Sequence, residues 1–184
     1  MNERIINTNQ DVKEGLSYIT STCPRMAYAQ SLTGPLPLRR RPDGFSQLLS
    51  AIVSQQVSVA AARAIWAKMQ AARLTGPRKV LWASADDLRA AGLSRQKVRY
   101  AKALAEARID YKALREAPTE EVVKTLTEVP GIGVWTAEIY AMFSLGRADV
   151  FAPGDLALQE AARLLYDLPE RPRERDLREM ATVW

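Results

Sequence analysis

The stretch VPGIGVWTA, Val129–Ala137, carries the clearest structural signal in this sequence. Two glycines flank one apolar residue, a proline precedes them, and a helical pattern follows. Glycines adopt backbone torsions that other residues avoid, and they carry no side chain that would block a phosphate. The amides of Gly131, Ile132 and Gly133 fall at the start of a helix, where free N–H groups and the helix dipole favour an anion. The stretch therefore predicts either a plain turn between two helices or a phosphate-binding hairpin.

The composition narrows the class of protein. The chain has 184 residues, 47% of them hydrophobic, which suits one mid-sized domain or two small lobes. A formal net charge of +5 favours an anionic partner such as nucleic acid, although a basic protein without such a partner has the same composition. One cysteine, Cys23, and no histidine exclude a disulfide framework, a histidine-based catalytic site and an ordinary zinc site. No signal-peptide or membrane-spanning segment is visible, so we expect a soluble intracellular protein.

Helical patterns fill most of the chain. Apolar residues at helical spacing from Phe45 to Val53 define one inner face. Ser58, Ser84 and Ser94 are the expected N-caps of later helices. The helix that follows the hairpin is expected to turn three residues inward: Ile139, Met142 and Phe143.

Strand signals are weak. The one short β-like run, ADVFAP at 148–153, is expected to be a loop, and the proline-rich basic stretch 33–44 is expected to be a connection. Helix after helix, joined by short segments, predicts an all-α fold.

Four segments, in this order, make the chain resemble a known family. They are IVSQQVSVAAARAI (Ile52–Ile65), AGLSRQKVRYAKALAEA (Ala91–Ala107), the hairpin VPGIG and DVFAPGDLAL (Asp149–Leu158). Together they resemble the helix-hairpin-helix DNA glycosylases, a base-excision repair superfamily, and most of all its alkylation-repair branch, the DNA-3-methyladenine glycosylase II type in compact form. The resemblance covers roughly Phe45 to the C-terminus. It implies a two-lobed all-α fold with the DNA groove and base pocket between the lobes.

The resemblance assigns roles to two residues. The superfamily's catalytic aspartate falls on Asp155 in PGD, and the alternative is that Asp155 only caps the helix that follows it. Lyase-competent members carry a lysine five residues after the hairpin proline, and Trp135 occupies that position here. Because an indole cannot form a Schiff base, we expect a monofunctional enzyme that removes a base without AP lyase activity.

A protein that lacks histidine could excise an alkylated purine. The positive charge of such a purine makes the base a good leaving group without a strong general acid. The resemblance implies that Asp155 stabilises the oxocarbenium-like sugar and orients water. An aromatic pocket would prefer the cationic base through cation–π contact, although packing in the core is the alternative for its aromatic residues. Related bacterial enzymes carry a tyrosine where Ile139 stands here. The implied pocket residues are Trp135, Tyr140 and Ile139, with Trp66 as a weaker candidate.

A base in a duplex must be flipped out before it can be excised. By resemblance, SQQVS brings Gln55 and Gln56 near the gap left in the stack, with Gln56 or Val57 entering it. Capping of helix ends is the alternative for both glutamines. Two basic groups face either DNA or solvent: Arg95, Lys97 and Arg99, and Arg39–Arg41.

A phosphate-binding hairpin would read little base information, so its DNA binding would be largely independent of sequence. Ile132 would fill the gap between the two helices. The hairpin residues expected to contact DNA are Gly131, Ile132, Gly133 and Thr136. The carbonyl oxygens of Thr127, Val129 and Ile132 are candidates for holding a monovalent cation, Na+ or K+, that bridges to the phosphate.

The resemblance divides the chain into three parts. Residues 1–44 form an N-terminal helical segment that packs with the C-terminal helices. Residues 45–145 form a helical domain with the helix-hairpin-helix at 119–145, and 146–184 hold the catalytic-aspartate loop and the C-terminal helices. Relatives continue beyond the position of Trp184, and the larger bacterial ones carry an N-terminal β-rich domain, so the chain is expected to be compact and C-terminally short.

The expected function is excision of alkylated purines, of the 3-methyladenine type, from double-stranded DNA in base excision repair. We expect a monomer that needs no organic cofactor and has no membrane partner, in the cytoplasm with the nucleoid or, in a eukaryote, in the nucleus. Two alternatives remain open: the same fold acting on uracil or mismatched thymine, and a non-catalytic lesion-binding module.

Overall fold

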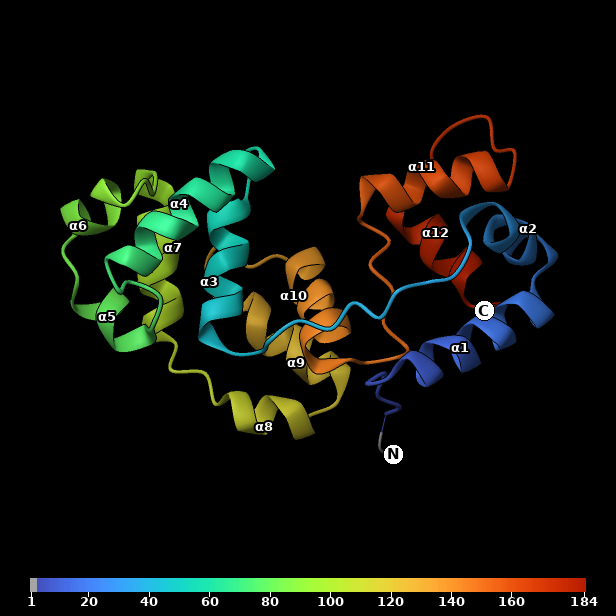
Figure 1. Ribbon diagram of the computed structural model, residues 1–184, viewed down its shortest axis with the longest axis horizontal. Helices are drawn as coiled ribbons and strands as arrows, with labels where there is room; N and C mark the ends of the chain where they lie inside the picture. Colours follow the sequence, from blue (N-terminus) through green and yellow to red (C-terminus); the bar gives the residue numbers. More distant parts are fainter. Residues whose placement is uncertain (1–2) are drawn as a thin grey trace. The chain divides into compact units, whose positions relative to one another are not determined.

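The computed structural model describes residues 3–184, and most of them are helical (Figure 1). Within this range the β-structure is limited to one isolated antiparallel bridge, between Ile5 and Arg147. The all-α prediction is therefore confirmed. The chain divides into two compact units. Unit 1 combines the chain up to Arg40 with Gly146–Trp184, and unit 2 is the continuous segment Arg41–Leu145.

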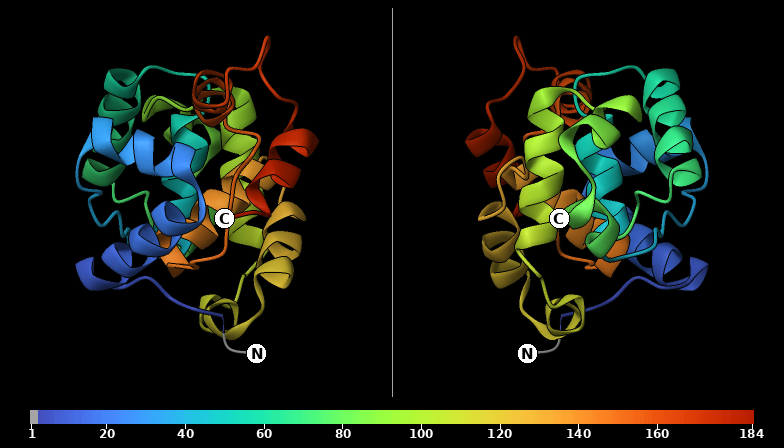
Figure 2. Two further views of the ribbon diagram at one scale, coloured as in Figure 1. Left: turned by 90° about the vertical axis from the view of Figure 1, so that its right-hand side faces the viewer. Right: turned by 90° about the vertical axis from the view of Figure 1, so that its left-hand side faces the viewer.

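Unit 2 contains the larger set of helices. They are α3 (Phe45–Ser54), α4 (Val59–Ala71), α5 (Pro77–Trp82), α6 (Ala85–Ala90), α7 (Arg95–Glu106), α8 (Tyr111–Glu116), α9 (Thr119–Thr127), α10 (Val134–Tyr140) and the π-helix η1 (Ala141–Leu145). Helix α3 lies against α4 and α7, and α5 also lies against α7 (Figures 1 and 2). Helix α7 thus packs against α3, α5 and α6.

The sequence signals for these helices are mostly confirmed. The predicted inner face from Phe45 to Val53 is buried. Ser58, Ser84 and Ser94 each accept a hydrogen bond from the backbone N–H three residues further on, as N-caps do. Removal of apolar surface from water along α3 and its neighbours supplies the main stabilisation of the unit.

The predicted inner face of the helix after the hairpin is wrong by about one position. Ile139, Met142 and Phe143 are only half-buried, and the fully packed side carries Tyr140 and Ala141 instead. The Gly44 N–H donates to the Tyr140 hydroxyl at 2.7 Å, which directs that side of α10 inward. The helix then widens into η1, which changes the angular position of each later residue.

Unit 1 contains α1 (Asn9–Thr22), α2 (Pro24–Thr33), α11 (Leu156–Leu165) and α12 (Glu174–Ala181). The N-terminal part of the chain is joined to the C-terminal part by hydrogen bonds from Ile6 N–H to the Gly146 carbonyl (2.7 Å) and from Arg25 to the Leu165 carbonyl (2.5 Å). Residues 148–153 form a loop, as predicted, and 34–44 contain no helix. Each unit is therefore built from helices with non-helical joints.

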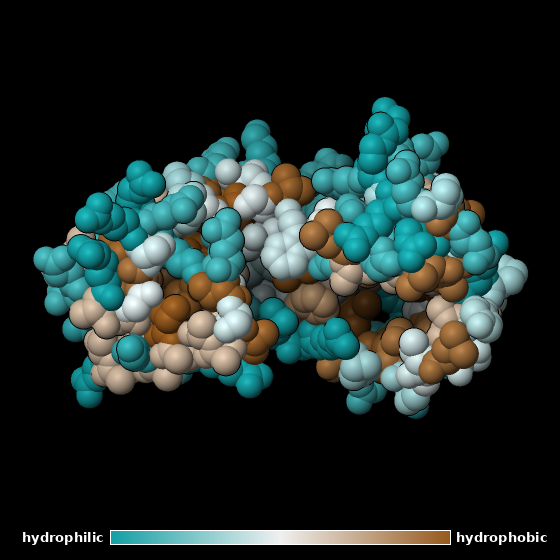
Figure 3. Space-filling view, turned by 90° about the horizontal axis from the view of Figure 1, so that it is seen from above, coloured by the Kyte–Doolittle hydropathy of each residue, from teal (hydrophilic) through white to brown (hydrophobic). Residues whose placement is uncertain are grey.

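Hydrophilic side chains cover much of the visible surface, with apolar side chains exposed between them (Figure 3). The large exposed apolar side chains include those of Trp82 on α5 and Trp135 on α10. No helix within residues 3–184 combines the length and the apolar character needed to cross a bilayer.

Candidate nucleic-acid interface and catalytic aspartate

The hairpin joins α9 to α10 through a turn in which the two glycines have different roles. Gly131 has a φ of +93°, a left-handed conformation that disfavours other residues. A side chain at Gly131 would also collide with the ring of Tyr100 on α7. Gly133 has an ordinary φ of −90°, and the position of a side chain there is open. Gly131 thus shapes the turn, whereas Gly133 leaves its outer side clear.

The turn uses one of the three amides that the sequence suggested for an anion. The Ile132 N–H donates to the Val129 carbonyl at 3.0 Å, so it closes the turn. The Ile132 side chain is buried, as expected of a residue that fills the gap between the two helices. Gly133 is the N-cap of α10 and has no side chain to accept from the first N–H groups of that helix. An anion at this end would therefore meet Gly133 and the first turn of α10.

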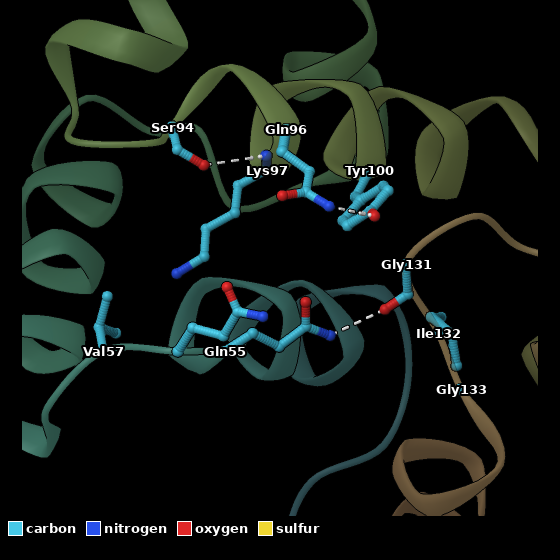
Figure 4. A pocket seen from close by; sticks show the side chains of 10 residues that line it. Gln55, Val57, Ser94, Gln96, Lys97, Tyr100, Gly131, Ile132 and Gly133 are labelled. Atoms are coloured by element: carbon cyan, nitrogen blue, oxygen red, sulfur yellow. Dashed lines mark hydrogen bonds between the residues drawn. The ribbon is translucent and has the colours of Figure 1, made fainter.

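A pocket of about 510 Å³ lies beside the hairpin, within unit 2 (Figure 4). Three segments form its wall: the turn after α3, the first turns of α7 and the hairpin loop. The lining residues are Gln55, Gln56, Val57, Ser94, Gln96, Lys97, Tyr100, Gly131, Ile132 and Gly133. The structure thus brings the SQQVS segment and the hairpin, far apart in sequence, to one site.

The two glutamines differ in their environments. Gln55 Nε2 donates to the Gly131 carbonyl at 2.8 Å, so this side chain ties the end of α3 to the hairpin (Figure 4). Gln56 is exposed and has a φ of +54°, which is uncommon for a residue with a side chain. Val57, the other candidate for entering DNA, is also exposed. Gln55 therefore supports the turn that presents Gln56 and Val57.

Lys97 is buried, although the sequence predicts that it faces either DNA or solvent. It is 9% exposed, and its Nζ donates to the Val53 carbonyl at 2.7 Å. Burial lowers the pKa of its ammonium below the ordinary value. Arg95 and Arg99 on the same helix are exposed. The spacing of Lys97 from Ala101, four residues, is a signal that could have placed it on the inner face of α7.

The residues expected to form a base pocket are not equally accessible. Trp135 on α10 is 45% exposed. Tyr140 is 3% exposed, accepts from the Gly44 N–H, and has a pKa that burial raises to about 12. Thr136 is buried, and Ile139 and Trp66 are half-buried. Trp135 is therefore the aromatic residue of this set with a large surface available, and the burial of Tyr140 favours a packing role.

Asp155 caps helix α11 in unit 1. Its Oδ1 accepts hydrogen bonds from the N–H groups of Ala157 at 2.8 Å and Leu158 at 3.3 Å. The loop before it is stabilised by Gln159, whose Nε2 donates to the Pro153 carbonyl at 2.9 Å. A carboxylate held by two backbone donors has a fixed direction, which both a helix cap and a catalytic group require. The capping role is thus observed, and it is compatible with catalysis.

Residues 49–184 match the family described as the HhH-GPD superfamily base excision DNA repair protein. This chain belongs to that superfamily. DNA-3-methyladenine glycosylase 1 of Schizosaccharomyces pombe is 28% identical over 92% of this chain and 78% of the relative. A crystal structure of a DNA-3-methyladenine glycosidase from Bacillus halodurans matches with a TM-score of 0.82 at 32% identity, over 100% of this chain and 86% of that one.

A second similar structure contains DNA. It is the Schizosaccharomyces pombe 3-methyladenine DNA glycosylase Mag1 in complex with abasic DNA, with a TM-score of 0.79 at 26% identity. The match covers 92% of this chain and 88% of Mag1. The helix-hairpin-helix interpretation of VPGIG thus agrees with the family that the chain matches.

The two hairpin glycines provide a matched test of the turn. Gly131→Ala places a side chain in left-handed backbone against Tyr100, so we expect the free energy of unfolding to fall by at least about 1 kcal/mol. Gly133→Ala, in open space at an ordinary φ, is expected to change it by less than about 0.5 kcal/mol. Urea unfolding of both variants measures the difference. Equal losses would contradict the different roles assigned to the two glycines.

Proposed function

We propose that this protein is a monofunctional DNA glycosylase that removes alkylated purines, of the 3-methyladenine type, from double-stranded DNA in base excision repair. The observation that supports this activity most is the likeness to the Bacillus halodurans DNA-3-methyladenine glycosidase along the whole chain. Trp135, at the position where lyase-competent members carry lysine, supports hydrolysis without strand cleavage because an indole cannot form a Schiff base.

The reaction we propose is hydrolysis of the N-glycosidic bond. An alkylated purine carries a positive charge, so bond cleavage releases a neutral base and leaves an oxocarbenium-like sugar. The chain contains no histidine, and this leaving group needs no strong general acid. We assign stabilisation of the cationic sugar, and orientation of the attacking water, to the carboxylate of Asp155. Two backbone hydrogen bonds already fix the direction of this carboxylate.

Base recognition is assigned to Trp135. Its exposed indole can place a π-face against the flipped base, and a π-face attracts a cation more than a neutral ring. Ile139 supplies apolar contact beside it, and Tyr140 supports α10 from within the unit. This arrangement favours a positively charged base over its undamaged counterpart.

We assign binding of the DNA phosphate backbone to the hairpin. The N-terminus of α10, without a capping side chain, suits a phosphate oxygen. The carbonyl oxygens of Thr127, Val129 and Ile132 would hold a Na+ or K+ ion, and carbonyl oxygens are ligands that such ions take in proteins. The Val129 carbonyl accepts one hydrogen bond, from Ile132, which leaves a second lone pair for the ion. When bound, the ion would add positive charge beside the phosphate.

No organic cofactor enters this proposed reaction, because hydrolysis of the N-glycosidic bond to a cationic base requires only water and a carboxylate. We propose that the protein acts as a monomer on damaged duplex DNA, in the nucleoid or the nucleus.

Release of free base is the decisive measurement for this function. Incubation with methylated duplex DNA is expected to release 3-methyladenine, with strand breaks appearing only after a separate alkali step. Breaks before alkali would contradict the monofunctional proposal. Binding of the duplex without release of base would favour a lesion-binding module, and release of uracil or mismatched thymine alone would favour a different lesion.

Asp155→Asn tests the carboxylate without removing the helix cap, because asparagine caps helices about as well as aspartate. We expect the single-turnover rate of base release to fall by about 100-fold or more, with stability and duplex binding retained. Full activity of this variant would overturn the catalytic assignment of Asp155.

Gly133→Asp tests the phosphate site at the hairpin. Aspartate suits the N-cap position of α10, so the fold is expected to remain stable, but its charge repels a phosphate. We expect duplex affinity to fall by about tenfold at low salt, irrespective of DNA sequence, and less at high salt. Gly133→Asn has a similar shape without the charge and serves as the control. Equal affinities of the two variants would show that no phosphate binds there.

A further inference from the structure

The ammonium of Lys97 lies at the C-terminal end of α3. The last carbonyl groups of a helix lack intrahelical partners and carry partial negative charge, so a cation there is favourable. Lys97 Nζ donates to the Val53 carbonyl, and Val53 is the residue before the last of α3. Burying this charge costs free energy, as the lowered pKa of the ammonium indicates. The hydrogen bond to the helix-end carbonyl therefore offsets part of the cost of burying the charge.

The chain leaves α3 through two residues of contrasting backbone conformation. Gln55 is extended, with a φ of −62° and a ψ of 134°, and Gln56 is left-handed. A left-handed residue that is not glycine is strained by roughly 1–2 kcal/mol and persists where neighbouring contacts hold it. Two contacts hold this turn: Lys97 fixes the carbonyl before it, and the Gln55 side chain fixes it to the Gly131 carbonyl.

These contacts link α3, α7 and the hairpin within unit 2, and Figure 4 shows the bond between Gln55 and Gly131. Helix α7 contributes Lys97, which reaches the end of α3, and Tyr100, whose ring lies against Gly131. Gln55 then joins the turn after α3 to Gly131. The turn after α3, the hairpin and α7 are thus joined by direct contacts.

We infer that Lys97 is a positioning residue for DNA: its buried ammonium holds the Gln56–Val57 turn in the shape that enters the DNA stack. This inference rests on the proposed glycosylase function. Because the Gln56–Val57 turn is already ordered, it loses less conformational entropy when it enters the duplex. The flipped state of the target base is therefore easier to reach. Lys97 acts through the turn and touches no phosphate, since it is 9% exposed and its Nζ is directed at Val53.

Lys102 provides a matched control on the same helix. Its Nζ donates to the Leu81 carbonyl at 2.7 Å and to the Ala83 carbonyl, so it holds the C-terminal end of α5. Lys97 and Lys102 thus perform the same structural task at two helix ends, but Lys102 does not line the pocket beside the hairpin. Substitution by methionine removes the ammonium from either residue and keeps the aliphatic stem.

The experiment compares Lys97→Met and Lys102→Met, each alone and together with the turn variant Gln56→Ala/Val57→Ala. We expect both lysine variants to lose stability to urea, whereas single-turnover release of 3-methyladenine slows by about tenfold in Lys97→Met alone. We expect the effect of Lys97→Met to disappear in the turn variant, because the side chains that it positions are then absent. The dependence of duplex affinity on salt is expected to stay that of the wild type.

Three results would overturn the inference. Equal slowing by Lys102→Met, or an undiminished effect of Lys97→Met in the turn variant, would make Lys97 a general structural residue. A salt slope reduced by about one would make it a phosphate contact. Should Lys97→Met fail to fold, Lys97→Arg, which keeps the charge at a shifted position, replaces it in the same cycle.

Base release by the wild-type protein distinguishes failure of this inference from failure of the proposed function. A wild type that releases no alkylated base contradicts the proposed function. The same cycle, measured as affinity for duplex DNA with an abasic site, then decides the role of Lys97: loss of affinity in Lys97→Met that vanishes in the turn variant supports it, and unchanged affinity overturns it.

Discussion

The left-handed backbone of Gly131, pressed against the ring of Tyr100, is the constraint on which the hairpin region depends. It brings the turn between α9 and α10 so close to α7 that no Cβ fits between them. The Gly131 carbonyl then points to Gln55, and the Ile132 N–H closes the turn on Val129. One backbone conformation thus sets the positions of an α7 aromatic ring, a hairpin and the end of α3.

Polar contacts at helix ends, rather than extended polar networks, give unit 2 its detailed shape. The ammonium groups of Lys97 and Lys102 each donate hydrogen bonds to carbonyl groups at the C-terminal end of a helix. The Tyr140 hydroxyl accepts a hydrogen bond from the Gly44 N–H at the start of α3. Hydrophobic burial is non-directional, so it brings helices together without fixing how loops leave them. Directional bonds at the helix ends determine those exits, and the candidate DNA contacts lie on them.

Local signals could be predicted from the sequence, and long-range contacts could not. The N-caps at Ser58, Ser84 and Ser94, the buried face of α3 and the hairpin itself follow from residues a few positions apart. The hydrogen bond between Gln55 and Gly131 joins residues 76 positions apart, and no periodic pattern in the sequence predicts it. The inner face of α10 was misplaced because the Gly44–Tyr140 contact and the π-helix η1 override a regular 3.6-residue period. The sequence predicts that Lys97 faces DNA or solvent, whereas its bond to the Val53 carbonyl joins residues 44 positions apart.

Unit 1 is assembled from two stretches of chain that are separated by the whole of unit 2. On a ribosome, Ile6 and the α2 residue Arg25 emerge before unit 2, but their hydrogen-bond partners, Gly146 and Leu165, are made only after all of Arg41–Leu145 has appeared. Unit 2, which is one continuous segment, can therefore fold before the second segment of unit 1 has been made. The loop containing Asp155 follows unit 2 in the chain, so the cap that Asp155 places on α11 can form only after the whole of unit 2 has been made.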